Sequence, residues 1–201
     1  MSYEFDVFVS YRRYGEWPTW VKEWFMPLFK HWLGEELGRE PRIFVDYNID
    51  EGVLWLPELA RALSRSKVLV ALWTPTYFGS KWCTSELAYM YAREEQCRLG
   101  TVQHTRGLIV PAALHDGDRF PQKAQDIQRA DLQDCANVRI AKGSPTAEAL
   151  SDRICSWAPK IARAIRGAPD FDPAWESLAL DKFLDLFKRD DSEQTELPSL
   201  G

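Results

Sequence analysis

Trp82 and Glu86 are the residues whose types and spacing point most directly to chemistry. They stand four positions apart, and residues four apart share one face of a helix. A carboxylate beside an indole can hold ribose hydroxyls and stabilise the positive charge that develops on a sugar when an N-glycosidic bond breaks. The plainer alternatives are a solvated glutamate in the first turns of a helix and a tryptophan that serves packing.

Further candidates stand where the first two predicted strands end. Ser10, Tyr11, Arg12 and Arg13 close the first strand, and Asp46 closes the second. In open α/β sheets, ligands bind beyond the carboxyl ends of the strands, where the strand order reverses. Either arginine could neutralise a dinucleotide phosphate or form a surface ion pair. Asp46 could contact the ligand or orient the loop that follows it.

Several other site chemistries lack their motifs. The sequence has no GxxxxGK[ST] and no GxGxxG after the first strand, so phosphate-cradling loops are unsupported. The third strand ends in Trp73-Thr74, where a phosphoacceptor receiver domain would need an aspartate. No nucleophile elbow, HExxH or cysteine cluster suggests acyl transfer or a metal site, so we expect neither metal nor cofactor.

Strands that alternate with helices place these candidates on a parallel sheet. The strands are predicted from short apolar runs at 5–11, 42–46, 67–73, 108–114 and 137–140. The helices are predicted at 17–38 with a kink or break near Met26 caused by Pro27, at 55–64, at 81–98, and at 150–165 with a kink at Pro159. We therefore predict an α/β fold, a flavodoxin-like three-layer sandwich with a five-stranded parallel sheet.

The composition changes beyond Gly167, which divides the chain into residues 1–166 and a C-terminal extension, 167–201. A short amphipathic helix is predicted over about 173–188, followed by a disordered tail. The apolar face of this helix must be buried somewhere. Docking on its own domain and binding a partner are equally economical.

The composition limits the partners and the compartment. A net charge of −5 argues against a general nucleic-acid binder. No apolar run is long enough to span a bilayer, so we expect no membrane contact and a cytoplasmic protein. The four cysteines form no CxxC pair, which favours reduced and mostly buried thiols.

Four ordered motifs together resemble the TIR (Toll/interleukin-1 receptor) domain family over roughly residues 4–165. They are Phe5-Asp6-Val7-Phe8-Val9-Ser10-Tyr11-Arg12, Ile43-Phe44-Val45-Asp46, Ser66-Lys67-Val68-Leu69-Val70 and Ser80-Lys81-Trp82-Cys83-Thr84-Ser85-Glu86-Leu87. The likeness is strongest to stand-alone bacterial TIR proteins. The resemblance implies that Glu86 is catalytic and that Trp82 is the tryptophan of the WxxxE motif.

The enzymatic branch of the family implies a function for the whole chain. That function is cleavage of NAD at the nicotinamide–ribose bond by a glycohydrolase, and additional cyclase or transferase activity stays open. The resemblance also implies self-association through the loop at 47–54, a separate effector or sensor protein as a partner, and a role in bacterial anti-phage immunity.

Two other functions stay open at this point. The first is a non-catalytic TIR scaffold, which would assemble without releasing nicotinamide. The second is an enzyme like the nucleoside deoxyribosyltransferases, which would act on deoxynucleosides and not on NAD.

Overall fold

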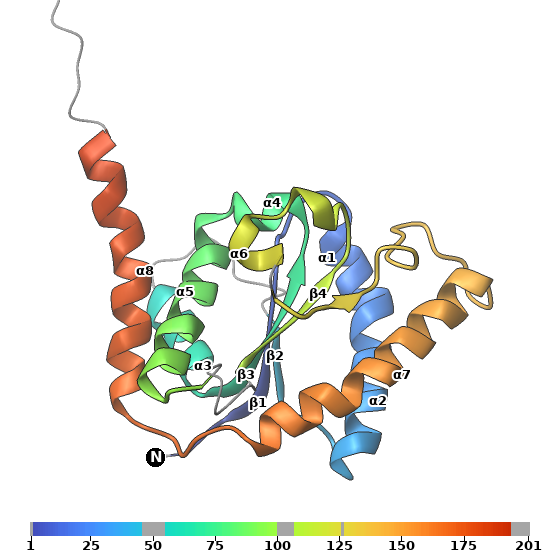
Figure 1. The fold of residues 1–201 in the computed structure, drawn as a ribbon, viewed down its shortest axis with the longest axis horizontal. Helices are drawn as coiled ribbons and strands as arrows, with labels where there is room; N and C mark the ends of the chain where they lie inside the picture. The colour runs from blue at the N-terminus through green and yellow to red at the C-terminus, as the bar shows by residue number, and fades with distance from the viewer. Residues whose placement is uncertain (1, 46–54, 100–106, 126, 194–201) are drawn as a thin grey trace, which may run out of the picture.

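The five strands form one parallel sheet in the order β2-β1-β3-β4-β5 (Figure 1). A computed structural model describes residues 2–45, 55–99, 107–125 and 127–193 of the chain. The strands are β1 (Phe5–Tyr11), β2 (Ile43–Val45), β3 (Ser66–Trp73), β4 (Ile109–Ala113) and β5 (Ala130–Asp131). This order is the flavodoxin-like one, and its switch point lies between β1 and β3. The predicted fold class is confirmed.

The position of the fifth strand differs from the prediction. Residues 137–140 form turns, and Ala130–Asp131 pairs with β4 instead. The side chain of Asn137 accepts a hydrogen bond from the backbone N–H of Arg139 (2.9 Å), which closes a local turn. Val138 is exposed. The residue types of this stretch are typical of a strand, but its backbone does not pair with the sheet. The Asn137 side chain accepts a backbone hydrogen bond and so favours a turn.

Helices cover both faces of the sheet (Figure 1). One face carries α1 (Trp17–Trp20), η1 (Val21–Phe25), α2 (Met26–Leu37) and α7 (Pro145–Arg166). The other face carries α3 (Trp55–Ser64) and α5 (Lys81–Gln96), with α8 (Ala174–Glu193) packed outside them. Short helical turns complete the chain: α4 (Pro75–Phe78), η2 (Gly117–Arg119) and α6 (Gln122–Gln125).

Near Met26, where a kink or break is predicted, the chain stays helical and changes helix type. A turn of π-helix, η1, precedes α2, and the N–H of Met26 donates to the carbonyl of Val21. Pro27 then falls in the first turn of α2, where no N–H is needed. The helix ends as predicted at Gly38, whose φ of 67° suits a residue without a Cβ. The last predicted helix is α7, which includes Pro159 within its length.

The extension docks on its own domain. Trp175, Ala179 and Phe183 of α8 are buried against α3 and α5. The ring of Trp175 lies 4.0 Å from the guanidinium carbon of Arg93, a buried side chain of α5. Desolvated cation–π contacts of this kind contribute about 2 kcal/mol. Of the two alternatives for the apolar face, the structure shows burial within the chain; residues 194–201 lie outside the described part.

Asp6 joins the start of β1 to the segment before β2. Its fully buried carboxylate accepts hydrogen bonds from both terminal nitrogens of Arg39 (2.7 and 2.8 Å) and from the backbone N–H of Arg42 (3.0 Å). Burial alone would raise the pKa of Asp6, but the hydrogen bonds and charges of Arg39 and Arg42 outweigh burial and lower the pKa below its ordinary 3.8. The ionised form is thus favoured in the folded state.

Asp6→Asn should lower the free energy of unfolding by about 2 kcal/mol at pH 7. Because the folded pKa lies below the unfolded one, this stabilisation is present above about pH 4 and is lost as the pH falls further. Urea unfolding at pH 7 and pH 3 should show the difference between wild type and variant shrinking in acid. Asp118→Asn, at an exposed site, is the control. An undiminished difference at pH 3 would contradict this account.

Candidate functional site

A cavity of about 240 Å³ lies at the carboxyl end of β1, beside the switch point of the sheet. It is lined by Phe8, Val9, Ser10, Tyr11, Arg12 and Arg13 from β1 and the residues after it, and by Ser80, Trp82, Cys83 and Glu86 from the start of α5. Six of the seven candidate residues therefore line one cavity. The seventh, Asp46, lies outside the described residues.

The start of α5 brings Trp82 and Glu86 to the cavity. Ser80 caps the helix: its Oγ accepts a hydrogen bond from the backbone N–H of Cys83 (3.4 Å). The same Oγ accepts from Nη1 of Arg12 (3.1 Å), which ties the residue after β1 to this helix end. The cap therefore fixes the distance between the two walls of the cavity.

Glu86 is a buried carboxylate with an ordered partner. Its side chain is 7% exposed, and its Oε2 accepts a hydrogen bond from the hydroxyl of Ser10. The Ser10 hydroxyl also lies 2.8 Å from the Tyr77 hydroxyl, which donates to the carbonyl of Cys83 (3.3 Å). A chain of hydroxyl groups thus orients the one carboxylate among the lining residues.

Tyr77 stays protonated in this chain of hydroxyl groups. Burial, then the charges of Cys83 and Glu86, raise the pKa of Tyr77 well above its ordinary value. A neutral phenol keeps its one proton, which Tyr77 donates to the carbonyl of Cys83. The hydroxyl of Ser10 donates its own proton to Glu86, which keeps that carboxylate oriented for a ligand.

The sequence analysis did not identify Tyr77 and Ser80. Ser80 could have been found, because a serine just before a helical pattern is a typical N-cap. Tyr77 could not, because a buried aromatic residue in a short turn has the appearance of core. Its role depends on a contact between residues 67 positions apart.

Trp82 contacts both the cavity and the extension. It is half-buried, and its ring centroid lies 6.1 Å from that of Phe183 on α8. Tyr89 and Arg93 lie further along α5; both are fully buried, and neither lines the cavity. The packing alternative for Trp82 is thus part of its role, and α8 supports a wall of the cavity.

The charges of the cavity suit a ligand with both a sugar and phosphates. Arg12 and Arg13 lie on the β1 side, and Glu86 lies on the α5 side. Guanidinium groups bind phosphate oxygens with two parallel hydrogen bonds, and a carboxylate accepts from sugar hydroxyls.

Over the described ranges, no three His, Cys, Asp or Glu side chains gather as metal ligands. In the same ranges no helix is long and apolar enough to cross a membrane. All four cysteines are free thiols, two of them buried.

Comparisons with known proteins identify the family. No curated protein matches the chain. Among solved structures, the TIR domains in the activated Roq1 resistosome of a plant, which directly recognises the pathogen effector XopQ, align with a TM-score of 0.40 and 16% identity. That alignment covers 92% of this chain and 99% of the other. The sequence profile of the TIR domain matches residues 7–142, well over half of the chain. The chain belongs to the TIR domain family.

Proposed function

We propose that this TIR domain is an NAD glycohydrolase, which releases nicotinamide and an ADP-ribose product. The observation that carries the proposal is the buried carboxylate of Glu86, oriented by Ser10 in a cavity that also has Trp82 and two arginines. Buried and ordered carboxylates in a crevice at the switch point are typical of functional sites. NAD is the substrate, and the proposal needs no metal and no further cofactor.

The proposed chemistry breaks one bond of the substrate. The bond between the nicotinamide nitrogen and C1′ breaks, and its electron pair stays on that nitrogen. Nicotinamide leaves as a neutral molecule and needs no proton donor. The positive charge moves to the ribose, where Glu86 stabilises it. Water then bonds to C1′ and loses a proton; a nucleophile within the same molecule would instead give a cyclic product.

Ser10 is a positioning residue in this proposal. Ser10→Ala removes the hydroxyl that orients Glu86, and a misplacement of about 1 Å costs roughly a hundredfold in rate. We expect kcat to fall by about that factor while KM changes little, because the arginines and Trp82 still bind the substrate. Steady-state kinetics with NAD measures both constants. A rise in KM with unchanged kcat would show that Ser10 binds substrate and does not position Glu86.

The biological role follows from the family resemblance. We infer self-association through TIR contacts in which the loop at 47–54 meets a neighbouring molecule; this loop lies outside the described residues. A bacterial stand-alone protein of this type would act in anti-phage immunity, by NAD depletion or by a nucleotide signal. A separate sensor or effector protein would then provide the trigger or receive the signal.

Nicotinamide release by the purified full chain tests the proposal. It is measured over a series of protein concentrations, with and without a crowding agent, and with deoxynucleosides as alternative substrates. Release from NAD that rises more than linearly with protein concentration is the expected result, because assembly completes the site. Assembly without release at any concentration would favour the scaffold. Activity on deoxynucleosides alone would favour the deoxyribosyltransferase alternative.

A further inference from the structure

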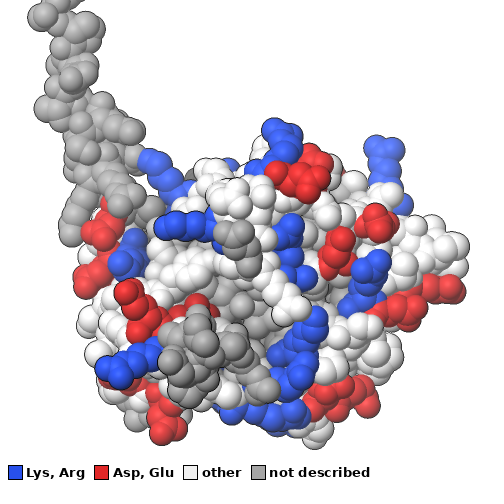
Figure 2. Space-filling model, viewed as in Figure 1, with Lys and Arg blue, Asp and Glu red and all other residues white. Residues whose placement is uncertain are grey.

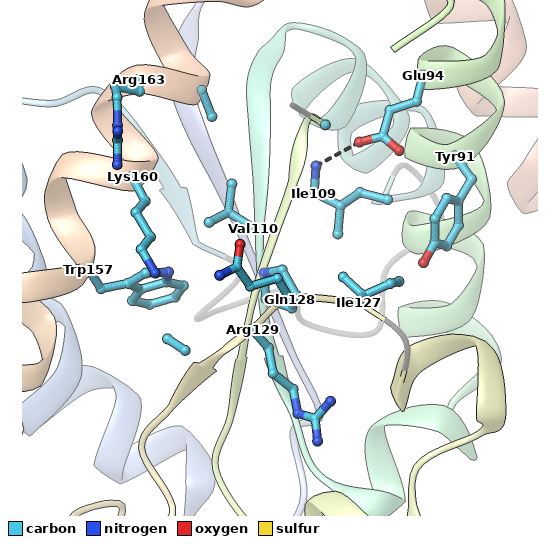
Figure 3. Close-up of a pocket in the computed structure, with 14 residues that line it drawn as sticks. Tyr91, Glu94, Ile109, Val110, Ile127, Gln128, Arg129, Trp157, Lys160 and Arg163 are labelled. Carbon is cyan, nitrogen blue, oxygen red and sulfur yellow. Dashed lines mark hydrogen bonds between the residues drawn. The ribbon is translucent and has the colours of Figure 1, made fainter. Parts of the chain in front are cut away.

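A second cavity, of about 540 Å³, lies beside the first half of β4, between α5 and α7 (Figure 3). It is bounded by α5, by the first half of β4, by the residues before β5 and by α7, and none of its lining residues lines the Glu86 cavity. Cavities of this size accommodate ligands of the size of a nucleotide. We propose that it binds a phosphorylated small molecule with a flat apolar body, such as a nucleoside monophosphate.

The cationic wall of this cavity comes from α7. Lys160 and Arg163 stand three positions apart, so their side chains are neighbours on the helix, and both are exposed. Among the residues that the structure describes, no carboxylate pairs with either one; Arg163 donates only to the carbonyl of Pro159 (3.2 Å). A phosphate group between the two would receive hydrogen bonds from an ammonium and a guanidinium.

The surrounding charge favours an anion. The chain carries a net charge of −5, yet Figure 2 shows Lys and Arg side chains in a band down the middle of the face presented in Figure 1. Arg129 adds a third positive charge to the lining, although its guanidinium is occupied by the carbonyl of Gln125 (3.2 Å) and the ring of Phe120. Positive charge concentrated around a concave site raises the local concentration of anions.

Glu94, the one carboxylate among the lining residues, already accepts backbone hydrogen bonds. Its Oε1 accepts a hydrogen bond from the backbone N–H of Ile109 (3.0 Å; Figure 3) and another from that of Leu108. Burial raises the pKa of Glu94, so its negative charge is disfavoured there. Glu94 therefore does not compete with a phosphate for Lys160 and Arg163, which lie across the cavity on α7 (Figure 3).

The free edge of β4 in this cavity has no backbone N–H with which to pair another strand. β5 pairs only with Ala112 and Ala113, so the first half of β4 has no strand partner among the described residues on that side. Leu108 directs its carbonyl to β3, and backbone groups alternate along a strand, so Ile109 and Pro111 face the open edge. The N–H of Ile109 is held by Glu94, and proline has none. Without a donor, this edge suits a small ligand better than an added strand.

An apolar wall completes the site. Ile109, Val110 and Ile127 line it with the ring of Trp157, which lies beside Lys160 on α7 (Figure 3). A flat base or similar body placed there would lose its contact with water while its phosphate reaches the two cations. Inorganic phosphate would leave this wall uncovered, so the phosphate ester should bind more tightly than the free ion.

The test uses AMP as the probe and the indole N–H resonance of Trp157 as a local reporter. Spectra of the ¹⁵N-labelled full chain are titrated with AMP, adenosine and inorganic phosphate, and Trp157→Phe assigns the resonance. We expect a saturable shift with AMP, and affinities at least tenfold weaker for adenosine and for inorganic phosphate. Glu86→Gln should bind AMP as wild type does, so this result is independent of NAD cleavage.

The double variant Lys160→Gln/Arg163→Gln should weaken AMP binding at least tenfold. Lys22→Gln/Lys30→Gln removes the same charge from exposed positions on η1 and α2 that do not line the cavity, and should bind AMP as wild type does. Equal binding by the two double variants, or no saturable shift of the Trp157 resonance up to about 10 mM AMP, would overturn the proposal. Inorganic phosphate that binds as tightly as AMP would overturn the part of it that concerns the apolar wall.

Discussion

Glu86→Gln should lower the rate of nicotinamide release from NAD by about a thousandfold. The substitution keeps the size of the side chain and an oxygen that can accept the hydrogen bond from Ser10. It removes the negative charge that stabilises the ribose cation, and in a buried site that charge acts with little screening by water. The loss should therefore fall on kcat, with KM changed much less.

Glu95→Gln is the matched control for this prediction, because Glu95 is an exposed glutamate on the same helix. It should retain the wild-type rate. Both variants should keep the wild-type circular dichroism spectrum and a free energy of unfolding within about 1 kcal/mol. Nicotinamide release by Glu86→Gln at a rate near that of Glu95→Gln would remove Glu86 from the mechanism.

Phe183→Ala should lower the free energy of unfolding by about 3 to 5 kcal/mol. The Phe183 side chain is fully buried between α8 and the domain, and its removal leaves a cavity beside Trp82. Leu184→Ala is the control: Leu184 follows Phe183 on α8 and is 38% exposed, so its truncation should cost less than about 1 kcal/mol. Urea unfolding of the full chain measures both values.

The same pair of variants tests the support that α8 gives to the cavity. If the proposed function holds, Phe183→Ala should also raise KM for NAD, because Trp82 loses the ring against which it packs. Leu184→Ala should leave KM unchanged. Equal losses of stability in the two variants would contradict the burial of α8. A loss of stability without a change in KM would contradict only its link to the cavity.

The central strands and the cavity could be predicted because their cause is local. β1 is apolar from Val7 to Val9 and β3 from Val68 to Trp73, as strands covered on both faces must be in their centres. Parallel strands bring their carboxyl ends to one edge of the sheet. The topology then places Ser10 near the helix that carries Glu86. The six candidate residues were found by type and by position in this scheme, and their lining of one cavity follows from the strand order.

The errors concern features that depend on distant partners. β5 is two residues long and exists only because Ala112 and Ala113 offer an edge, so its own sequence carries almost no pattern. Pro27 predicted a kink or break near Met26, and a turn of π-helix before it, which no sequence pattern indicated, lets the chain stay helical. The apolar face of α8 could be recognised from the sequence, but its docking site could not. That site includes the buried Arg93, whose charge is typical of a surface residue.

The position of bound NAD in crystals of Glu86→Gln tests the central claim most directly, since this variant should bind the substrate and leave it intact. We predict that the nicotinamide ribose lies in the cavity between Ser10 and Trp82, with C1′ within about 4 Å of the side chain at position 86 and the diphosphate near Arg12 or Arg13. NAD bound with its nicotinamide ribose away from position 86, whether in the second cavity beside β4 or elsewhere, would contradict the account.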